Sequence, residues 1–161
     1  MIALVPVTPQ NRARFEGLVV ASSQEDLLAD TVPWLDEALD EPHTQTFGVI
    51  AQDKPAGLAS LMDTRDAPPE LYKEAFQQGC AYLWRFLIDA DAQGRGLGRM
   101  ALTALEQEAR GLSATGLSLT TADKIAGNAL GFYTRMGYAP TGRRLGGEIE
   151  LVKRFEEACN A

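Results

Sequence analysis

The stretch that decides the fold is FLIDADAQGRGLGRMALTALEQEAR, residues 86–110. An apolar run stops at Asp89, glycines follow at alternate positions 94, 96 and 98, and a helical pattern comes after them. Glycine lets successive backbone N–H groups turn toward one point, and the start of a helix adds unpaired donors and a positive dipole end. Three alternate glycines between a strand and a helix therefore favour a phosphate-binding loop over a simple tight turn.

Length and charge limit the class of protein. The chain has 161 residues, 45% of them hydrophobic and 23% charged, which suits a single domain over residues 1–161. Its formal net charge is −7 at pH 7. This balance argues against a nucleic-acid partner, because nucleic-acid recognition needs a basic face, and it leaves room for a cationic substrate.

The sequence lacks the marks of a membrane or metal protein. No apolar run approaches the roughly 18 residues of a membrane span, and the first residues lack the pattern of a secretory signal. The single histidine, His43, and the cysteines Cys80 and Cys159 show no metal-ligand or redox spacing. We therefore expect a cytoplasmic protein with no membrane partner and no metal site.

Hydrophobic periodicity predicts an α/β protein with a central mixed sheet and about four flanking helices. The expected helices include residues 11–21, 32–41, 98–111 and 128–137, the third with a buried stripe that contains Leu112. The expected strands cover residues 2–7, 46–52, 57–64, 81–88, 117–122, 138–145 and 148–155, with turns at 53–56 and 146–147. Residues 66–80 are an insertion, and Ser22 and Glu25 have the spacing of a capping box.

Two common phosphate-binding patterns do not explain the glycines. No Gly-Lys-Ser/Thr closes the loop, so the P-loop pattern fails. Gly96, Gly98 and Ala101 satisfy G-x-G-x-x-G/A, with Asp123 near the distance of a ribose-binding acid. A dinucleotide fold, however, places this loop after its first strand, whereas here a predicted hairpin lies upstream.

The pattern that fits is Q-x-x-G-x-G, with Gln93, Gly96 and Gly98 at its defined positions, followed later by NALGFYTRMGY, residues 128–138. With these motifs in this order, the sequence resembles the GNAT family of acetyl-CoA-dependent N-acetyltransferases over nearly the whole chain. The resemblance implies the GNAT fold, a mixed sheet with flanking helices, and acetyl-CoA as the cosubstrate.

The resemblance also implies which residues bind the cosubstrate. Amides of the loop from Gly94 to Arg99 would hold the coenzyme A pyrophosphate, and the strand end at 86–88 would splay from its neighbour and pair with the pantetheine arm. Asn128 would contact the pantetheine region, and Tyr133 would lie near the sulfur. The full binding set is Phe86, Leu87, Ile88, Gln93, Gly94, Arg95, Gly96, Leu97, Gly98, Arg99 and Asn128.

Acetyl transfer to an amine needs a proton donor for the leaving thiolate and an acceptor for the amine proton. Tyr133 is the candidate acid, because donation from a phenol of pKa about 10 to a thiolate of pKa about 8.5 costs only about 2 kcal/mol. The base stays open. Many relatives use a glutamate on the strand before the glycine loop, but residues 80–88 contain no acid. A water chain that ends on Asp63, Glu148 or Glu150, or an acid from a loop, would serve instead.

The acceptor is an amine. YLWRFLIDADAQGRGLG and GFYTRMGYAPTGRRLGGEIELVKRF resemble the spermine/spermidine acetyltransferase-like branch, which implies a polyamine such as spermidine or spermine. Tyr82, Trp84 and Tyr72 would line its channel, and Asp63 or Glu148 would pair with a distal ammonium. Another small amine, an aminoglycoside or a protein N-terminus stays open as the acceptor. So do a non-catalytic module that senses acetyl-CoA, and a homodimer.

Overall fold

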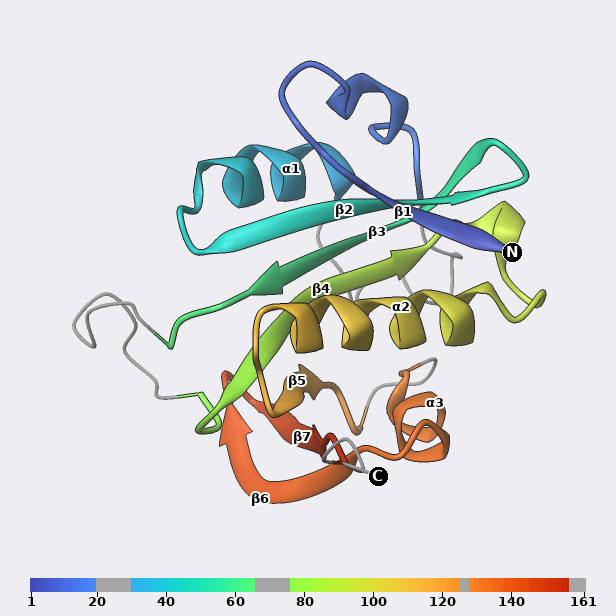
Figure 1. Cartoon of the computed structure of the whole chain (residues 1–161). Helices are drawn as coiled ribbons and strands as arrows, with labels where there is room; N and C mark the ends of the chain where they lie inside the picture. The colour runs from blue at the N-terminus through green and yellow to red at the C-terminus, as the bar shows by residue number, and fades with distance from the viewer. Residues whose placement is uncertain (20–29, 66–75, 125–127, 157–161) are drawn as a thin grey trace, which may run out of the picture.

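One seven-stranded sheet organises the part of the chain that the structure describes (Figure 1). The computed structural model describes residues 1–19, 30–65, 76–124 and 128–156. The strands are β1 (Ile2–Pro6), β2 (Thr44–Ala51), β3 (Lys54–Met62), β4 (Cys80–Ile88), β5 (Gly116–Thr121), β6 (Ala139–Leu145) and β7 (Glu148–Arg154). Their order in the sheet is β1-β2-β3-β4-β5-β7-β6, and only β4 and β5 run parallel to each other. The predicted mixed α/β sheet is confirmed.

Within the described ranges, the α-helices are α1 (Thr31–Asp40), α2 (Leu97–Gly111) and α3 (Leu130–Arg135). Two short 3-10 helices, η1 (Arg12–Arg14) and η4 (Ala90–Ala92), accompany them. The described part thus has three α-helices where the sequence predicts about four. None of these helices is long and apolar enough to cross a membrane.

The helices cover opposite faces of the sheet, and each face has its own apolar core. Trp34 and Leu35 of α1 pack with Leu58 on one face. Leu102 of α2 packs with Ala59, the next residue of β3, on the other. Successive side chains of a strand point to opposite faces, so β3 contributes to both cores. Figure 1 shows α2 lying across β4 and β5.

Two tight hairpins have the backbone that a two-residue turn needs. Gln52 and Asp53 connect β2 to β3 with φ of 52° and 63°, and Gly146 and Gly147 connect β6 to β7 with φ of 60° and 86°. Positive φ at both central residues matches the right-handed twist of the paired strands. The second turn confirms the prediction. The first lies earlier than the predicted 53–56, because β3 already begins at Lys54.

The helix predicted over residues 11–21 is wrong for the described residues 11–19, where only η1 is helical. Asn11 turns the chain: its Oδ1 accepts the Thr8 N–H at 2.8 Å, and its Nδ2 donates to the Pro6 carbonyl at 3.0 Å. Phe15 is fully buried against the α1 face. The helix-like spacing of apolar residues here therefore comes from an irregular segment that packs on the core, and not from a helix. Ser22, Glu25, Tyr72, Cys159 and residues 66–75 of the predicted insertion lie outside the described residues.

The buried stripe of α2 is confirmed except at its end. Leu102, Leu105 and Ala109 are fully buried, whereas Leu112 is 40% exposed. The helix ends at Gly111, and Leu112 is the C-cap, whose N–H donates to carbonyls of the last turn. Leu112 therefore no longer follows the helical period that places the other three against the sheet.

Gly48 of β2 packs directly against Phe15, so we expect Gly48→Ala to lower the free energy of unfolding. A Cβ at Gly48 would overlap the ring of Phe15, which is fully buried. Overpacking of this kind costs about 1–3 kcal/mol. Gly111→Ala is the matched control: no described atom lies within 4 Å of its added Cβ, and alanine favours the helix by about 1 kcal/mol. Urea unfolding measures both, and equal stabilities would contradict this account.

Candidate functional site

The strands β4 and β5 part in the middle of the sheet. They pair only where residues 80–83 face residues 116–119. Beyond that point β4 continues through residues 84–88 along β3, while Thr120 and Thr121 continue along β7. Within the described ranges, no strand pairs with this outer edge of β4. The sheet therefore opens into a wedge that exposes backbone hydrogen-bonding groups of β4.

A β-bulge lies at the point of divergence. Ser60 of β3 pairs with Arg85 and Leu61 pairs with Leu83, so Trp84 is the extra residue of β4. A bulge bends its strand and increases the local twist, which carries the end of β4 away from β5. It also resets the alternation, because Trp84 packs in the α1 core while Phe86 packs in the α2 core.

The wedge holds a cleft of about 1030 Å³. Most of the residues predicted for the cosubstrate line it: Phe86, Leu87, Ile88, Gln93, Gly94, Gly96, Leu97, Gly98, Arg99 and Asn128. So do Tyr133, Tyr82, Trp84 and Glu148. Three of the predicted residues that the structure describes, Arg95, Asp63 and Glu150, are not among its lining. Arg95 is exposed and its Nη2 donates to the Asp91 carbonyl at 3.3 Å, and Asp63 lies beyond the end of β3.

The glycine loop connects β4 to α2 with a backbone that side chains disfavour. Gly94 and Gly96 have φ of 80° and 74°, and a Cβ at either position would meet no described atom within 4 Å. These glycines are therefore required by backbone conformation and not by crowding. The Gln93 side chain donates to the Ile88 carbonyl at 3.0 Å, which ties the loop to the strand end. The amides of the first turn of α2 begin at this loop.

The short helix α3 forms another wall of the cleft. Asn128 Oδ1 accepts the Leu130 N–H at 3.0 Å just before the helix. The N-cap itself is Ala129, one residue after the Asn128 that the sequence pattern favours. The helix stops at Gly137, whose φ is 97°, and the Tyr138 N–H donates back to the Tyr133 carbonyl. This C-terminal motif ends the helix and sets the direction in which the chain continues toward β6.

Tyr133 is buried at the cleft wall and packs edge-on against Tyr138, with ring centroids 5.8 Å apart. Tyr138 is held in turn by Glu106, which accepts its hydroxyl at 2.8 Å and the Lys153 Nζ at 3.0 Å. Burial, followed by the negative charge of Glu148, raises the pKa of Tyr133 above its ordinary value. The Tyr133 hydroxyl therefore keeps its proton throughout the neutral range.

Three polar side chains form a hydrogen-bonded chain across the cleft. The Tyr82 hydroxyl lies 3.0 Å from Thr120 Oγ1, and Thr120 Oγ1 donates to Glu148 Oε1 at 3.1 Å. Phe76 stacks on the Tyr82 ring, with centroids 4.4 Å apart. All four residues line the cleft, so β4, β5 and β7 each bring one polar group to the same place.

Two other carboxylates that the sequence offers as bases have structural partners. Asp63 accepts two hydrogen bonds from Arg65, each at 2.8 Å, and these hydrogen bonds lower the pKa of Asp63. Glu150 is fully buried. Burial tends to raise the pKa of Glu150, but hydrogen bonds from Arg143, Thr141 and Gln77 outweigh it and lower the pKa. Both groups therefore hold their charge in fixed ion pairs.

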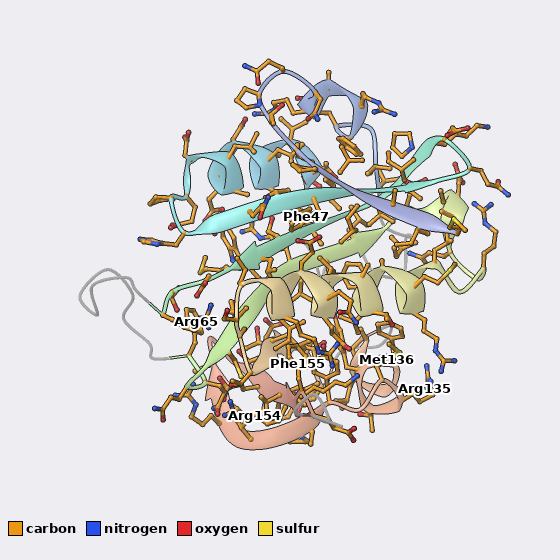
Figure 2. The ribbon with its side chains drawn as sticks, viewed as in Figure 1. Phe47, Arg65, Arg135, Met136, Arg154 and Phe155 are labelled. Carbon is orange, nitrogen blue, oxygen red and sulfur yellow. The ribbon has the colours of Figure 1, made fainter. Side chains whose placement is uncertain are left out.

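Arginines line the cleft at three separate places. Arg99 belongs to the first turn of α2, and Arg135 ends α3, where Figure 2 shows it beside Met136. Arg85 of β4 stacks on Trp84 at 4.3 Å and pairs with Glu37 of α1 at 3.0 Å. The charge of Arg85 is thus offset by its partner, while Arg99 and Arg135 stand on the two helices that flank the glycine loop.

Sequence reasoning missed several residues of the cleft, chiefly Met62, Phe76, Arg85, Thr120 and Arg135. For Thr120 a signal was present. The strand LSLTT alternates apolar and hydroxyl side chains, which indicates that one face of β5 meets polar groups. Phe76 lies in the predicted insertion, where the sequence pattern specifies no partner.

Comparison with known proteins identifies the class of this protein. The model of the acetyltransferase (GNAT) family matches residues 4–138. The chain belongs to this family, and it is an acetyl-CoA-dependent N-acetyltransferase. No curated protein gives a significant match to the sequence.

Solved structures share the fold at low identity. The PaiA N-acetyltransferase of Thermoplasma acidophilum in complex with coenzyme A is 12% identical, with a TM-score of 0.68 over 96% of this chain and 99% of that one. Aminoglycoside 6′-acetyltransferase type Ii is 15% identical, with a TM-score of 0.68 over 96% of each chain. The ribosomal-protein-S18-alanine N-acetyltransferase of Escherichia coli is 15% identical, with a TM-score of 0.62 over 94% of this chain and 91% of that one. At identities this low, and with an aminoglycoside named for one neighbour and a ribosomal-protein alanine for another, the likeness establishes the fold alone.

Proposed function

We propose that this acetyltransferase acts on a small primary amine, and specifically on a polyamine such as spermidine or spermine. The observation that carries the proposal is the wedge between β4 and β5, with the glycine loop at one side and the carboxylate of Glu148 at another. A cosubstrate and an amine that enter this cleft from different sides would meet beside Tyr133.

The residues of the cleft fit acetyl-CoA. Gly94 and Gly96 turn the loop backbone at the start of α2, where amides and the helix dipole favour an anion such as a pyrophosphate. Arg99 adds a positive charge at the same helix start. The outer edge of β4 at residues 86–88 offers backbone groups to the amides of the pantetheine arm. Acetyl-CoA supplies the acetyl group as a thioester.

Tyr133 would act as the proton donor to the sulfur. Its raised pKa keeps the hydroxyl protonated, which a donor requires. The same shift makes full proton transfer to the thiolate cost more than the roughly 2 kcal/mol expected for an unperturbed phenol. The hydroxyl would therefore first donate a hydrogen bond to the sulfur and release its proton only as negative charge develops there.

The acceptor end of the cleft suits an ammonium group. Tyr82, Trp84 and Phe76 provide aromatic surface, and Glu148 provides negative charge. The net charge of −7 would favour the approach of a polycation. Arg85 does not oppose this arrangement strongly, because Glu37 offsets its charge.

We expect Gly96→Val to weaken acetyl-CoA binding more than tenfold. A β-branched residue disfavours a φ of 74°, so the loop must change its backbone and move its amides. Gly142→Val is the matched control, since Gly142 has a φ of 90° in β6 but does not line the cleft. Calorimetry measures both affinities. Equal affinity for Gly96→Val and the wild type would show that the loop does not hold the pyrophosphate.

We expect Tyr133→Phe to lower kcat by about 10²-fold while acetyl-CoA affinity stays unchanged. The ring keeps its contact with Tyr138, so only the hydroxyl is lost. Steady-state kinetics between pH 6 and pH 9, with calorimetry as the binding control, test this. Wild-type turnover across that range would assign the proton to another donor.

We expect spermidine to be acetylated faster than a lysine peptide, with an apparent affinity that falls as salt rises. Screening would cause this fall, because the Debye length contracts from about 30 Å at 0.01 M to about 8 Å at 0.15 M. A simple monoamine is the control and should respond much less to salt. Free thiol release follows each reaction. Equal rates and equal salt responses for spermidine and the monoamine would exclude the polyamine.

A further inference from the structure

The reaction needs a route for the proton of the acceptor. An alkyl amine of pKa about 10.4 is neutral to less than one part in a thousand at pH 7, so nearly all of it arrives as ammonium. Residues 80–88 of β4 contain no carboxylate, and Asp63 and Glu150 are held in ion pairs. Of the acids that the sequence offers as bases, only Glu148 lines the cleft.

The hydrogen bonds around Thr120 have only one consistent direction. A hydroxyl has a single proton, and Thr120 donates it to Glu148 Oε1 at 3.1 Å. Thr120 Oγ1 must then accept in its 3.0 Å contact with Tyr82, so the Tyr82 hydroxyl is the donor. The order is Tyr82 to Thr120 to Glu148, and every proton in the chain points toward the carboxylate.

The hydrogen-bonded chain of Tyr82, Thr120 and Glu148 also has a fixed position in the wedge. Tyr82 comes from β4 before the strands part, Thr120 is the first residue of β5 beyond the last β4 pair, and Glu148 begins β7. Stacking of Phe76 on Tyr82 restrains the ring at one end of the chain. The three groups therefore connect the acceptor side of the cleft with its carboxylate through elements of the sheet.

We propose that Tyr82, Thr120 and Glu148 form a proton relay that deprotonates the acceptor amine. The proposal rests on the proposed function. The ammonium gives a proton to the Tyr82 oxygen as Tyr82 passes its own proton to Thr120 and Thr120 passes its proton to Glu148. Tyr82 and Thr120 end with as many protons as they began with, and Glu148 gains one, which it later releases to solvent.

The proton balance of the whole transfer closes with this relay. As the new N–C bond forms and the C–S bond breaks, the acceptor nitrogen loses a second proton. That proton replaces the one that Tyr133 gives to the sulfur. One proton in total reaches solvent, as expected when an ammonium and a thioester become an amide and a thiol.

Other titratable and charged groups lie near the relay, and they could also affect the pH dependence of kcat/KM for the amine. They are Tyr133 on α3, Glu150 on β7, and the arginines Arg85, Arg99 and Arg135 that line the cleft. Tyr133 stays protonated, and Glu150 is bound by Arg143. The acceptor amine, with a pKa of about 10.4, therefore dominates the expected profile between pH 7 and pH 9.

Thr120→Val is the decisive variant, because valine has nearly the shape of threonine but cannot carry a proton. We expect kcat/KM for the amine to fall by about 10²-fold at pH 7. The variant must use amine that is already neutral, so its rate should rise about tenfold per pH unit and approach that of the wild type by pH 9. Thr120→Ser keeps a hydroxyl at the same position and should recover most of the rate at pH 7.

Two further variants separate the relay from its alternatives. Glu148→Gln should reproduce the pH profile of Thr120→Val, because it removes the end of the same chain. Ser118→Ala, a buried hydroxyl two residues earlier on β5 that has no part in the chain, should leave the profile unchanged. Acetyl-CoA affinity and the unfolding midpoint should match the wild type in all four variants.

The outcomes are distinct. A wild-type profile for Thr120→Val, with loss in Glu148→Gln, would overturn the relay in favour of direct proton acceptance by Glu148. Equal losses in Thr120→Val and Thr120→Ser would show a packing role and also overturn it. A wild-type protein that binds acetyl-CoA but acetylates no amine would overturn the proposed function itself, and the relay with it.

Discussion

The structure depends on the early end of pairing between β4 and β5. Four residue pairs join the two strands, and the bulge at Trp84 then carries β4 away along β3. A parallel pair that continued would satisfy the backbone of both strands and leave no cleft. Because the pairing stops, backbone groups, the glycine loop and the start of α2 all face the same opening. The site thus lies along an unpaired strand edge in the middle of the sheet.

The charges around the opening have separate tasks. Burial keeps Tyr133 protonated, while Asp63 and Glu150 are bound by arginines and cannot accept a proton without breaking an ion pair. Glu148 differs, because its carboxylate accepts a hydrogen bond from a neutral group, the Thr120 hydroxyl. The same wedge therefore brings a phenol that keeps its proton and a carboxylate hydrogen-bonded to a neutral hydroxyl to the same cleft. An acetyl transfer to an ammonium needs a proton donor and a proton acceptor of these kinds.

Much of the fold was predictable because strong periodicity reports burial directly. The strand at 81–88, the helix after the glycine loop and the final hairpin were predicted with small errors at their ends. The helix expected at 11–21 failed because the apolar spacing of Phe15 and Leu18 serves a docked irregular segment. The prediction that Leu112 belongs to the buried stripe failed because an apolar pattern does not show where the backbone stops being helical.

The sequence by itself determined the glycine loop, the strand before it and the short helix with Tyr133, because these depend on residues that are neighbours in the chain. Local rules for φ, capping and periodicity act over a few residues, so a single stretch is enough to reveal them. Only the tertiary structure decided which acids reach the cleft. Asp63, Glu148 and Glu150 looked alike in the sequence. The different surroundings of the last two depend on partners distant in the chain, Gln77 for Glu150 and Thr120 for Glu148. Such contacts arise from strand order and register across the sheet, which no local pattern specifies.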